Sequence, residues 1–158
     1  SPAAPMKRVC LGGTFDILHA GHARLLDAAL AAGVRLVIGL ASDKFAASRR
    51  LSGRELAPYG ERERALRDWF AARDALDRVE IVSLAEEWGP AAEGADIDGI
   101  VVSEGTREAA ARLNARRLAH GLAVLEVVTV PHLLAADGLP VSASRIRAGE
   151  VDANGRQT

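Results

Sequence analysis

The chain has 158 residues, 49% of them apolar, with 20 basic and 21 acidic side chains and a formal net charge of −1. This length and composition suit one domain with a sizeable core, and the chain has no apolar run of about 18 residues that would suggest a membrane span. Because the basic and acidic side chains nearly balance, the chain as a whole is not attracted electrostatically to nucleic acid or to an anionic membrane surface. Neither is therefore expected as a partner. A single cysteine leaves no internal disulfide and suits the reducing, cytoplasmic compartment.

The chain is expected to consist of a body with two short ends. Residues 1–6 lack the charge and the apolar block of a signal peptide, so they are expected to be a disordered arm or a remnant of the expression system. Residues 7–152 are expected to form one domain, and residues 153–158 a polar tail. No internal repeat or low-complexity segment divides the body.

The first strand and helix are joined by a turn rich in glycine. An apolar run at 8–11 predicts a strand, and helical spacing from Leu25 predicts a helix that ends near Ala32. Between them, Gly12 and Gly13 let a ligand approach the main-chain amides closely. Because a helix N-terminus also favours negative charge, the turn predicts a phosphate site.

His19 and His22 are three residues apart at the start of that helix and share one of its faces. Both rings can point at one ligand, because Gly21 between them has no side chain that would keep the ligand away. They are expected to donate hydrogen bonds to phosphate oxygens rather than to act as bases. Two histidines are also half of a metal site, but Cys10 lies inside the strand and no further histidine or carboxylate stands at ligand spacing, so no metal ligand is predicted.

The second strand, at 34–40, is a nearly continuous apolar run and completes a βαβ unit. A short helix capped near Asp43 and a polar loop follow, and they carry Lys44, Arg49 and Arg50. Open α/β sheets bind ligands at the carboxyl ends of their strands, so these cations are candidates for a second anionic substrate. Lys44 is equally compatible with a solvated surface charge.

The remaining segments continue the alternation of helix and strand. Helices are predicted at 61–72 and 107–120, and strands at 78–84, 99–102 and 125–130. The alternation predicts an α/β fold: a single Rossmann-like, doubly wound domain with a five-stranded parallel sheet flanked by helices. The stretch 88–98 shows no clear pattern, and a polar turn at 103–106 precedes the last of these helices.

A second polar turn stands ahead of a helix near the end of the body. Pro140 closes a loop, and Ser142 and Ser144 can cap the helix that follows, so hydroxyls, amides and Arg145 converge at one N-terminus. Alone, this pattern is a common helix cap. Beside the first turn, it suggests that two helix N-termini hold a triphosphate from opposite sides.

The first turn, from Gly12 to His22, resembles the signature of the nucleotidyltransferase superfamily that carries His-x-Gly-His. Its members transfer a nucleotidyl group from a nucleoside triphosphate and release pyrophosphate. The string from Val141 to Arg147 is similar to the Ile-Ser-Ser-Ser-Arg-Ile-Arg string of archaeal-type phosphopantetheine adenylyltransferases. Further matches occur at Ser42-Asp43, Pro58-Tyr59, 101–104, Asn114, Arg117, Gly121-Leu122 and the run to Val130. The resemblance identifies residues 7–152 as the nucleotidyltransferase domain.

The resemblance implies a reaction in which ATP and 4′-phosphopantetheine give dephospho-coenzyme A and pyrophosphate, with Mg2+ on the nucleotide. The residues implied to be catalytic are Thr14, His19, His22 and Arg145. Those implied to bind ATP are Gly12, Gly13, Thr14, Phe15, His19, Gly21, His22, Ser103, Glu104, Thr106, Ser142, Ser144 and Arg145. Those implied to bind the acceptor are Thr14, Asp16, Lys44, Arg49 and Arg50.

The chain departs from the family pattern at two positions. Ala143 replaces the middle serine, which removes a hydroxyl but leaves the amide. Lys44 stands where an invariant lysine is not expected in this branch, so Arg49 or Arg50 is an alternative for bridging the substrates.

Two alternative functions stay open. The same chemistry on another acceptor would make the chain an FMN adenylyltransferase or a glycerol-3-phosphate cytidylyltransferase, and the first turn cannot separate these because it contacts only the triphosphate. A non-catalytic module that senses adenylates would bind a nucleotide without releasing pyrophosphate. The string at 141–147 favours pantetheine over the other acceptors, and the intact signature favours an enzyme over a sensor.

Overall fold

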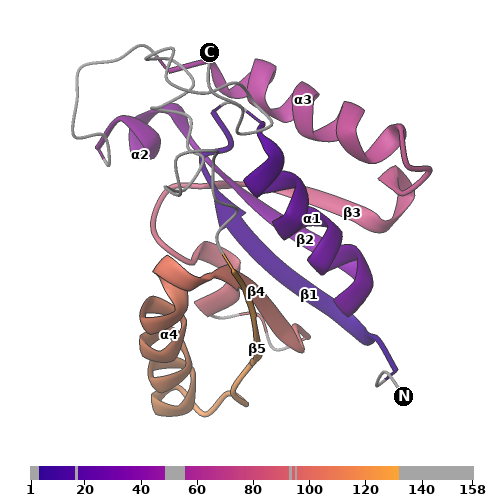
Figure 1. The fold of residues 1–158 in the computed structure, drawn as a ribbon. Coiled ribbons are helices and arrows are strands. Elements are labelled where there is room, and N and C mark those ends of the chain that lie inside the picture. Colours follow the sequence, from indigo (N-terminus) through magenta and orange to yellow (C-terminus); the bar gives the residue numbers. More distant parts are fainter. Residues whose placement is uncertain (1–3, 17, 49–55, 93, 95, 132–158) are drawn as a thin grey trace.

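The computed structural model describes residues 4–16, 18–48, 56–92, 94 and 96–131. Its centre is a sheet of five strands in the order β3-β2-β1-β4-β5 (Figure 1). The strands are β1 (Met6–Gly13), β2 (Gly33–Ala41), β3 (Val79–Leu84), β4 (Gly99–Ser103) and β5 (Glu126–Val130). Every neighbouring pair runs parallel, so the predicted α/β fold with a five-stranded parallel sheet is confirmed.

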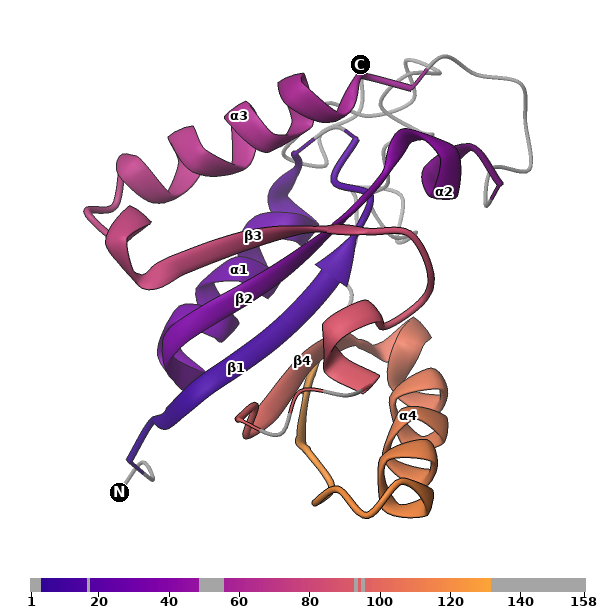
Figure 2. The same cartoon turned by 180° about the vertical axis from the view of Figure 1, so that it is seen from behind.

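Helices cover both faces of the sheet, which Figures 1 and 2 show from opposite sides. They are α1 (Ala20–Ala32), α2 (Asp43–Ser48), α3 (Tyr59–Ala71) and α4 (Arg107–Ala119), with the short 3-10 turns η1 (Leu76–Arg78), η2 (Gly89–Ala92) and η3 (Glu104–Thr106). On β1, Val9 and Leu11 pack in a cluster with apolar residues of α1 and α3. Cys10 instead packs with α4 and η2. Because neighbouring side chains of a strand point to opposite faces, the sheet is doubly wound.

β1 occupies the middle of the sheet, and the chain leaves it in both directions. It runs through α1 to β2 and then to β3, and returns to β4 on the other side of β1. The carboxyl ends of β1 and β4 therefore form a topological switch point, where open α/β sheets bind ligands. Gly12 and Gly13 end one of these strands, and Ser103 ends the other.

Most element boundaries differ from the predicted ones by one or two residues, among them those of β1 and α3. β1 is longer than predicted, because its pairing with β2 extends outward to Met6 and Gly13. α3 begins at Tyr59, immediately after a proline, instead of at Glu61. The stretch 88–98, which showed no pattern, contains the turn η2.

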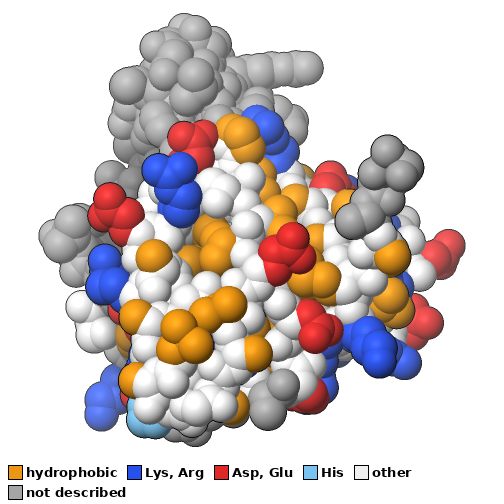
Figure 3. All heavy atoms as spheres, turned by 90° about the horizontal axis from the view of Figure 1, so that it is seen from below, with side chains coloured by type: hydrophobic (Ala, Val, Ile, Leu, Met, Phe, Trp, Pro, Cys, Tyr) orange, Lys and Arg blue, Asp and Glu red, His pale blue; other side chains and the backbone are white. Residues whose placement is uncertain are grey.

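The surface of the described residues carries charges of both signs. On the face in Figure 3, basic and acidic side chains are interspersed among apolar ones, so this face offers no continuous basic stripe of the kind that follows a nucleic-acid backbone. Large apolar side chains are exposed at Val34, Leu118 and Val124. None of the helices in the described ranges combines the length and the apolar character that a membrane crossing requires.

Arg62 on α3 is buried, with 1% of its surface exposed, although it carries a charge. Its Nη1 donates to the main-chain oxygens of Thr14 (2.9 Å) and Ala41 (2.8 Å). Its Nε donates to the main-chain oxygen of Ala57 (2.8 Å), and its Nη2 pairs with the carboxylate of Asp43 (2.7 Å). One side chain thus ties together the carboxyl ends of β1 and β2, the edge of the sheet that carries the switch point.

Replacing Arg62 by methionine is expected to lower the free energy of unfolding by about 3 kcal/mol or more, because three main-chain oxygens lose their donor. Urea denaturation measures this loss. Arg64→Met is the matched control: Arg64 is an exposed arginine on the same helix, and its replacement should change the free energy by less than about 0.5 kcal/mol. A loss below about 1 kcal/mol for Arg62→Met would contradict the structural role.

Candidate active site

Two cavities adjoin at the switch point. The smaller, about 220 Å3, lies beside the start of α1, and the larger, about 360 Å3, lies over the carboxyl halves of β1, β2 and β4. The described residues that line both cavities are Gly12, Gly13, Leu25 and Ser103. The ends of β1 and β4 therefore separate two neighbouring spaces, which suits a site for two ligands.

The smaller cavity contains both signature histidines. Its described lining is Gly12, Gly13, Phe15, His19, Gly21, His22, Leu25, Ser103, Val130 and Pro131. This set contains no carboxylate, whereas the imidazoles, the serine hydroxyl and the amides of a glycine-rich bend supply hydrogen-bond donors. Such a lining, next to a helix N-terminus, suits a polyanion.

His19 is the N-cap of α1. Its Nδ1 accepts hydrogen bonds from the amides of Gly21 (3.0 Å) and His22 (3.3 Å), two of the amides that a helix start leaves without a partner. A ring nitrogen that accepts hydrogen bonds carries no proton, so the proton of the neutral ring is on Nε2. This leaves Nε2–H as the donor that His19 can offer to a ligand.

His22 completes a reciprocal cap. The amide of His19 donates to Nδ1 of His22 at 3.4 Å, so each histidine satisfies the main chain of the other. The two rings stack, with centroids 3.8 Å apart and planes 20° apart. The structure therefore brings the two predicted residues together on one face, and both line the smaller cavity.

Two glycines make room for the aromatic rings of this bend. A Cβ on Gly21 would lie 2.9 Å from Cε1 of His19, and a Cβ on Gly13 would lie 3.1 Å from the ring of Phe15. Phe15 is buried, takes a φ of 49°, and its ring centroid lies 5.1 Å from that of His22. The bend is thus packed so tightly that a side chain at either glycine would displace a ring of the site.

Burial lowers the pKa of His19 below its usual value of 6.5. The neutral ring is also the form that the helix cap requires, because a proton on Nδ1 would face the two amide N–H groups that now donate to it. At neutral pH, free His19 is therefore an uncharged hydrogen-bond donor. This fits the prediction that it stabilises phosphate oxygens rather than removing protons.

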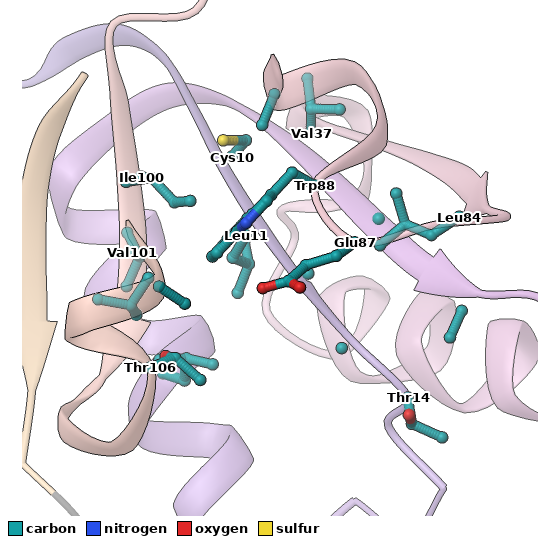
Figure 4. Close-up of a pocket in the computed structure, with 18 of the residues that line it drawn as sticks. Cys10, Leu11, Thr14, Val37, Leu84, Glu87, Trp88, Ile100, Val101 and Thr106 are labelled. Atoms are coloured by element: carbon teal, nitrogen blue, oxygen red, sulfur yellow. The ribbon is translucent and has the colours of Figure 1, made fainter. Parts of the chain in front are cut away.

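The larger cavity has mostly apolar walls, which Figure 4 shows in close-up. In that view the side chains of Glu87 and Trp88 extend into the space between Thr106 on one side and Thr14 on the other. Burial raises the pKa of Cys10, which lines this cavity, to about 12, so its thiol stays protonated and unreactive. The cavity therefore suits an extended, largely apolar ligand.

The predicted acceptor residues within the described ranges lie in different surroundings. Thr14 lines the larger cavity where β1 ends. The carboxylate of Asp16 accepts a hydrogen bond from the amide of Ala57 at 3.0 Å, so it ties the bend to the segment before α3. Lys44 is exposed on α2. Of these three, Thr14 alone lines a cavity.

The three predicted site residues after β4 differ in the cavities that they line. Ser103 lines both cavities, whereas Thr106 belongs to the described lining of the larger one alone. Oγ1 of Thr106 donates to the main-chain oxygen of Ser103 at 3.2 Å. Glu104 is exposed and is not part of the described lining of either cavity. Ser103 is thus the member of this group that meets both ligand spaces.

Five predicted site residues fall outside the described ranges: Arg49, Arg50, Ser142, Ser144 and Arg145. The departure at Ala143 lies there too. The basic loop and the second helix N-terminus therefore stay predictions from the sequence.

Three residues that shape the site were not among those predicted. Trp88 begins the stretch 88–98, which showed no clear pattern, and Glu87 stands just before it; a tryptophan before Gly89 was the available signal. Arg62 had a clearer one, since it stands four residues before Leu66 and therefore shares the buried face of α3. Arginine is seldom fully buried, so this position alone does not predict a buried side chain.

The fold and the paired cavities are those of an α/β domain suited to hold a polyanion next to a second ligand. The family described as cytidylyltransferase-like matches residues 10–149, and the chain belongs to this family of nucleotidyltransferases. A relative named phosphopantetheine adenylyltransferase from Methanopyrus kandleri is 43% identical over 152 residues, which cover 96% of this chain and 95% of that protein. A relative of the same name from Methanothermobacter thermautotrophicus is 37% identical and covers 93% and 87%.

A solved structure is also similar to this chain in fold and in sequence. The crystal structure of a protein of unknown function from Archaeoglobus fulgidus has a TM-score of 0.69 and 34% identity, and the match covers 79% of this chain and 89% of that one. Together, the family and the relatives confirm the resemblance to archaeal phosphopantetheine adenylyltransferases that the sequence motifs indicated.

The stability of the protein is expected to fall between about pH 7 and pH 5 through His19. The unfolded chain takes up a proton near the usual pKa of 6.5, whereas the folded chain resists it because burial lowers the pKa. The contribution is thus present above pH 6.5 and is lost as the pH falls through the lower, folded pKa.

Urea unfolding of the wild type and of His19→Asn over this pH range tests the expectation. Asparagine caps a helix without titrating. The stability of the wild type relative to the variant should therefore decrease as the pH falls. A difference that is constant with pH would contradict the assigned role of the ring nitrogen.

Proposed function

We propose that this chain transfers the adenylyl group of ATP to 4′-phosphopantetheine and releases pyrophosphate, giving dephospho-coenzyme A. The observation that carries the proposal is the pair of adjoining cavities, one lined with hydrogen-bond donors and one lined with apolar groups, on either side of Gly12 and Gly13. The names of relatives at 34 to 43% identity support the choice of acceptor.

The triphosphate suits the smaller cavity. Nε2–H of His19, the imidazole of His22 and the amides of the glycine-rich bend are donors for phosphate oxygens, and the N-terminus of α1 adds a favourable dipole. The predicted hydroxyls of Ser142 and Ser144 and the charge of Arg145 would complete the binding from the second helix. Such an arrangement stabilises charge on the leaving pyrophosphate.

The acceptor suits the larger cavity. Its volume, about 360 Å3, lies within the usual range for small-molecule sites. Its walls are mostly apolar, which matches the aliphatic parts of a pantetheine arm. Thr14 lines it directly after Gly13, which lines both cavities, and there its hydroxyl would hold the acceptor phosphate between the two substrates.

The reaction needs positioning more than covalent help from the protein. An oxygen of the acceptor phosphate attacks the α-phosphorus of ATP, and the bond from that phosphorus to the β-phosphate oxygen breaks, so its electron pair leaves with pyrophosphate. The nucleophile is already an anion, and no side chain has to remove a proton. The work of the site is in-line alignment and neutralisation of the developing charge.

Mg2+ is proposed to enter with the nucleotide. The smaller cavity offers imidazole and amide donors instead of the carboxylate oxygens that Mg2+ prefers. Among the described residues, no group of three or more histidine, cysteine, aspartate or glutamate side chains is placed to hold a metal ion. The ion would therefore be carried by the phosphate oxygens of ATP, where it would neutralise charge.

Lys44, Arg49 or Arg50 would contact the acceptor phosphate. The single free cysteine suits a cytoplasmic enzyme.

Incubation of the purified protein with ATP or CTP and with each acceptor tests the proposal. Pyrophosphate release is expected with ATP and 4′-phosphopantetheine. Release with FMN, or with CTP and glycerol 3-phosphate, would instead assign the site to another acceptor. Tight ATP binding without release under any combination would indicate a sensor of adenylates.

His22→Ala is expected to lower kcat on the order of a hundredfold, because one donor to the transition-state charge is lost. The protein should stay folded, since the hydrogen bond that the ring accepts from the amide of His19 is long, at 3.4 Å, and thermal unfolding checks this. The matched control is His120→Ala, which removes an exposed histidine just after α4 and should leave kcat unchanged. A fully active His22→Ala protein would remove this residue from the mechanism.

A further inference from the structure

The larger cavity contains one charged side chain among its described lining residues, that of Glu87. The other described groups around it are apolar side chains, glycines, two threonines, a serine, a protonated thiol and a tryptophan. Figure 4 shows the carboxylate extending into the space that the proposed acceptor arm would occupy. A carboxylate in this position will discriminate between ligands by their charge.

An ordered turn holds Glu87 in place. It stands between the end of β3 at Leu84 and the turn η2, which closes with a hydrogen bond from the amide of Ala91 to the main-chain oxygen of Trp88 at 2.8 Å. The buried side chain of Arg117 fixes this turn from behind, because its Nη1 donates to the main-chain oxygen of Ala91 at 2.7 Å. The wall that carries Glu87 is therefore tied to α4 as well as to the sheet.

Glu87 is an exposed residue of the described lining of the larger cavity. Within the described ranges, none of the ion pairs or hydrogen bonds engages its carboxylate. Water screens its carboxylate from the exposed side, whereas the mostly apolar walls lower the screening toward the cavity. A second negative charge brought into this space would therefore be repelled.

We propose that Glu87 is a specificity residue that makes the larger cavity select acceptors with an uncharged arm. This inference rests on the proposed function. The arm of 4′-phosphopantetheine carries a hydroxyl, two amides and a thiol, and no charge at neutral pH. The same molecule with one carboxylate on the carbon between the last amide nitrogen and the thiol-bearing carbon has equal length and equal donors, but an anionic arm.

The comparison of these two acceptors isolates the effect of the arm. Both carry the same phosphate, so any repulsion between Glu87 and that phosphate is common to them and cancels in the ratio of their kcat/KM values. The extra carboxylate remains as the difference. For two charges roughly 8 Å apart, with screening between that of protein and water, the preference due to Glu87 is about threefold to tenfold.

The test measures kcat/KM for both acceptors by pyrophosphate release with the wild type, Glu87→Gln and Glu86→Gln. Glu87→Gln should raise the relative use of the carboxylated acceptor about threefold to tenfold. Glu86→Gln removes the same charge from the neighbouring exposed residue, which is not part of the described lining, and should change the ratio less than about twofold. Glu87→Asp keeps the charge and should keep the preference.

Ionic strength provides an independent readout. Added salt should weaken the preference of the wild type and have little effect on the ratio in Glu87→Gln, because screening acts on charge and not on shape. An unchanged ratio in a folded Glu87→Gln protein, or an equal change in Glu86→Gln, would overturn the inference and leave the proposed function intact. Failure of the wild type to release pyrophosphate with either acceptor would overturn both.

Discussion

The geometry of the site depends on one ring nitrogen, Nδ1 of His19, which caps helix α1. It accepts hydrogen bonds from two main-chain amides of the helix start, so the same side chain that would meet the nucleotide also begins the helix. The cap fixes the tautomer and directs Nε2–H to the remaining side of the ring. It also explains Gly21, because a Cβ there would lie 2.9 Å from the ring. The signature His-x-Gly-His is therefore a folding unit as well as a binding unit.

The central strand gives the site its two chemical halves. Along β1, the side chains alternate between the cluster under α1 and α3 and the cluster under α4 and η2. Where side chains end at Gly12 and Gly13, the main chain itself becomes the boundary between a donor-lined and an apolar cavity. A phosphate at this boundary can approach the main chain closely, because neither glycine has a side chain. Two substrates with different chemistry can thus meet over one short stretch of backbone.

The parts of the fold that the sequence predicted are those determined by local patterns. Continuous apolar runs mark β2 and β4, and the glycines after α1 and α4 mark the ends of those helices, so their positions are legible without a structure. The first half of the site was predicted for the same reason, since its residues are consecutive. Strand order and the wall at Glu87 depend instead on contacts between distant residues, such as Arg117 with Ala91. The hydrophobic periodicity of the sequence reflects local structure and carries no information on such contacts.

Two buried arginines hold the main chain of loops beside the sheet. Arg62 donates to three main-chain oxygens around the ends of β1 and β2, and Arg117 donates to those of Ala91, Gly94 and Ala123. A guanidinium presents several donors in a rigid plane, which a lysine ammonium on its flexible stem cannot do. Arg62 thereby fixes the main chain at Thr14 and Ala41, and Arg117 fixes it at Ala91, so that each holds a part of the wall of the larger cavity. In-line transfer requires reacting atoms to be held about 3–3.5 Å apart, and a charged side chain buried beneath each part resists the small displacements that would lose this alignment.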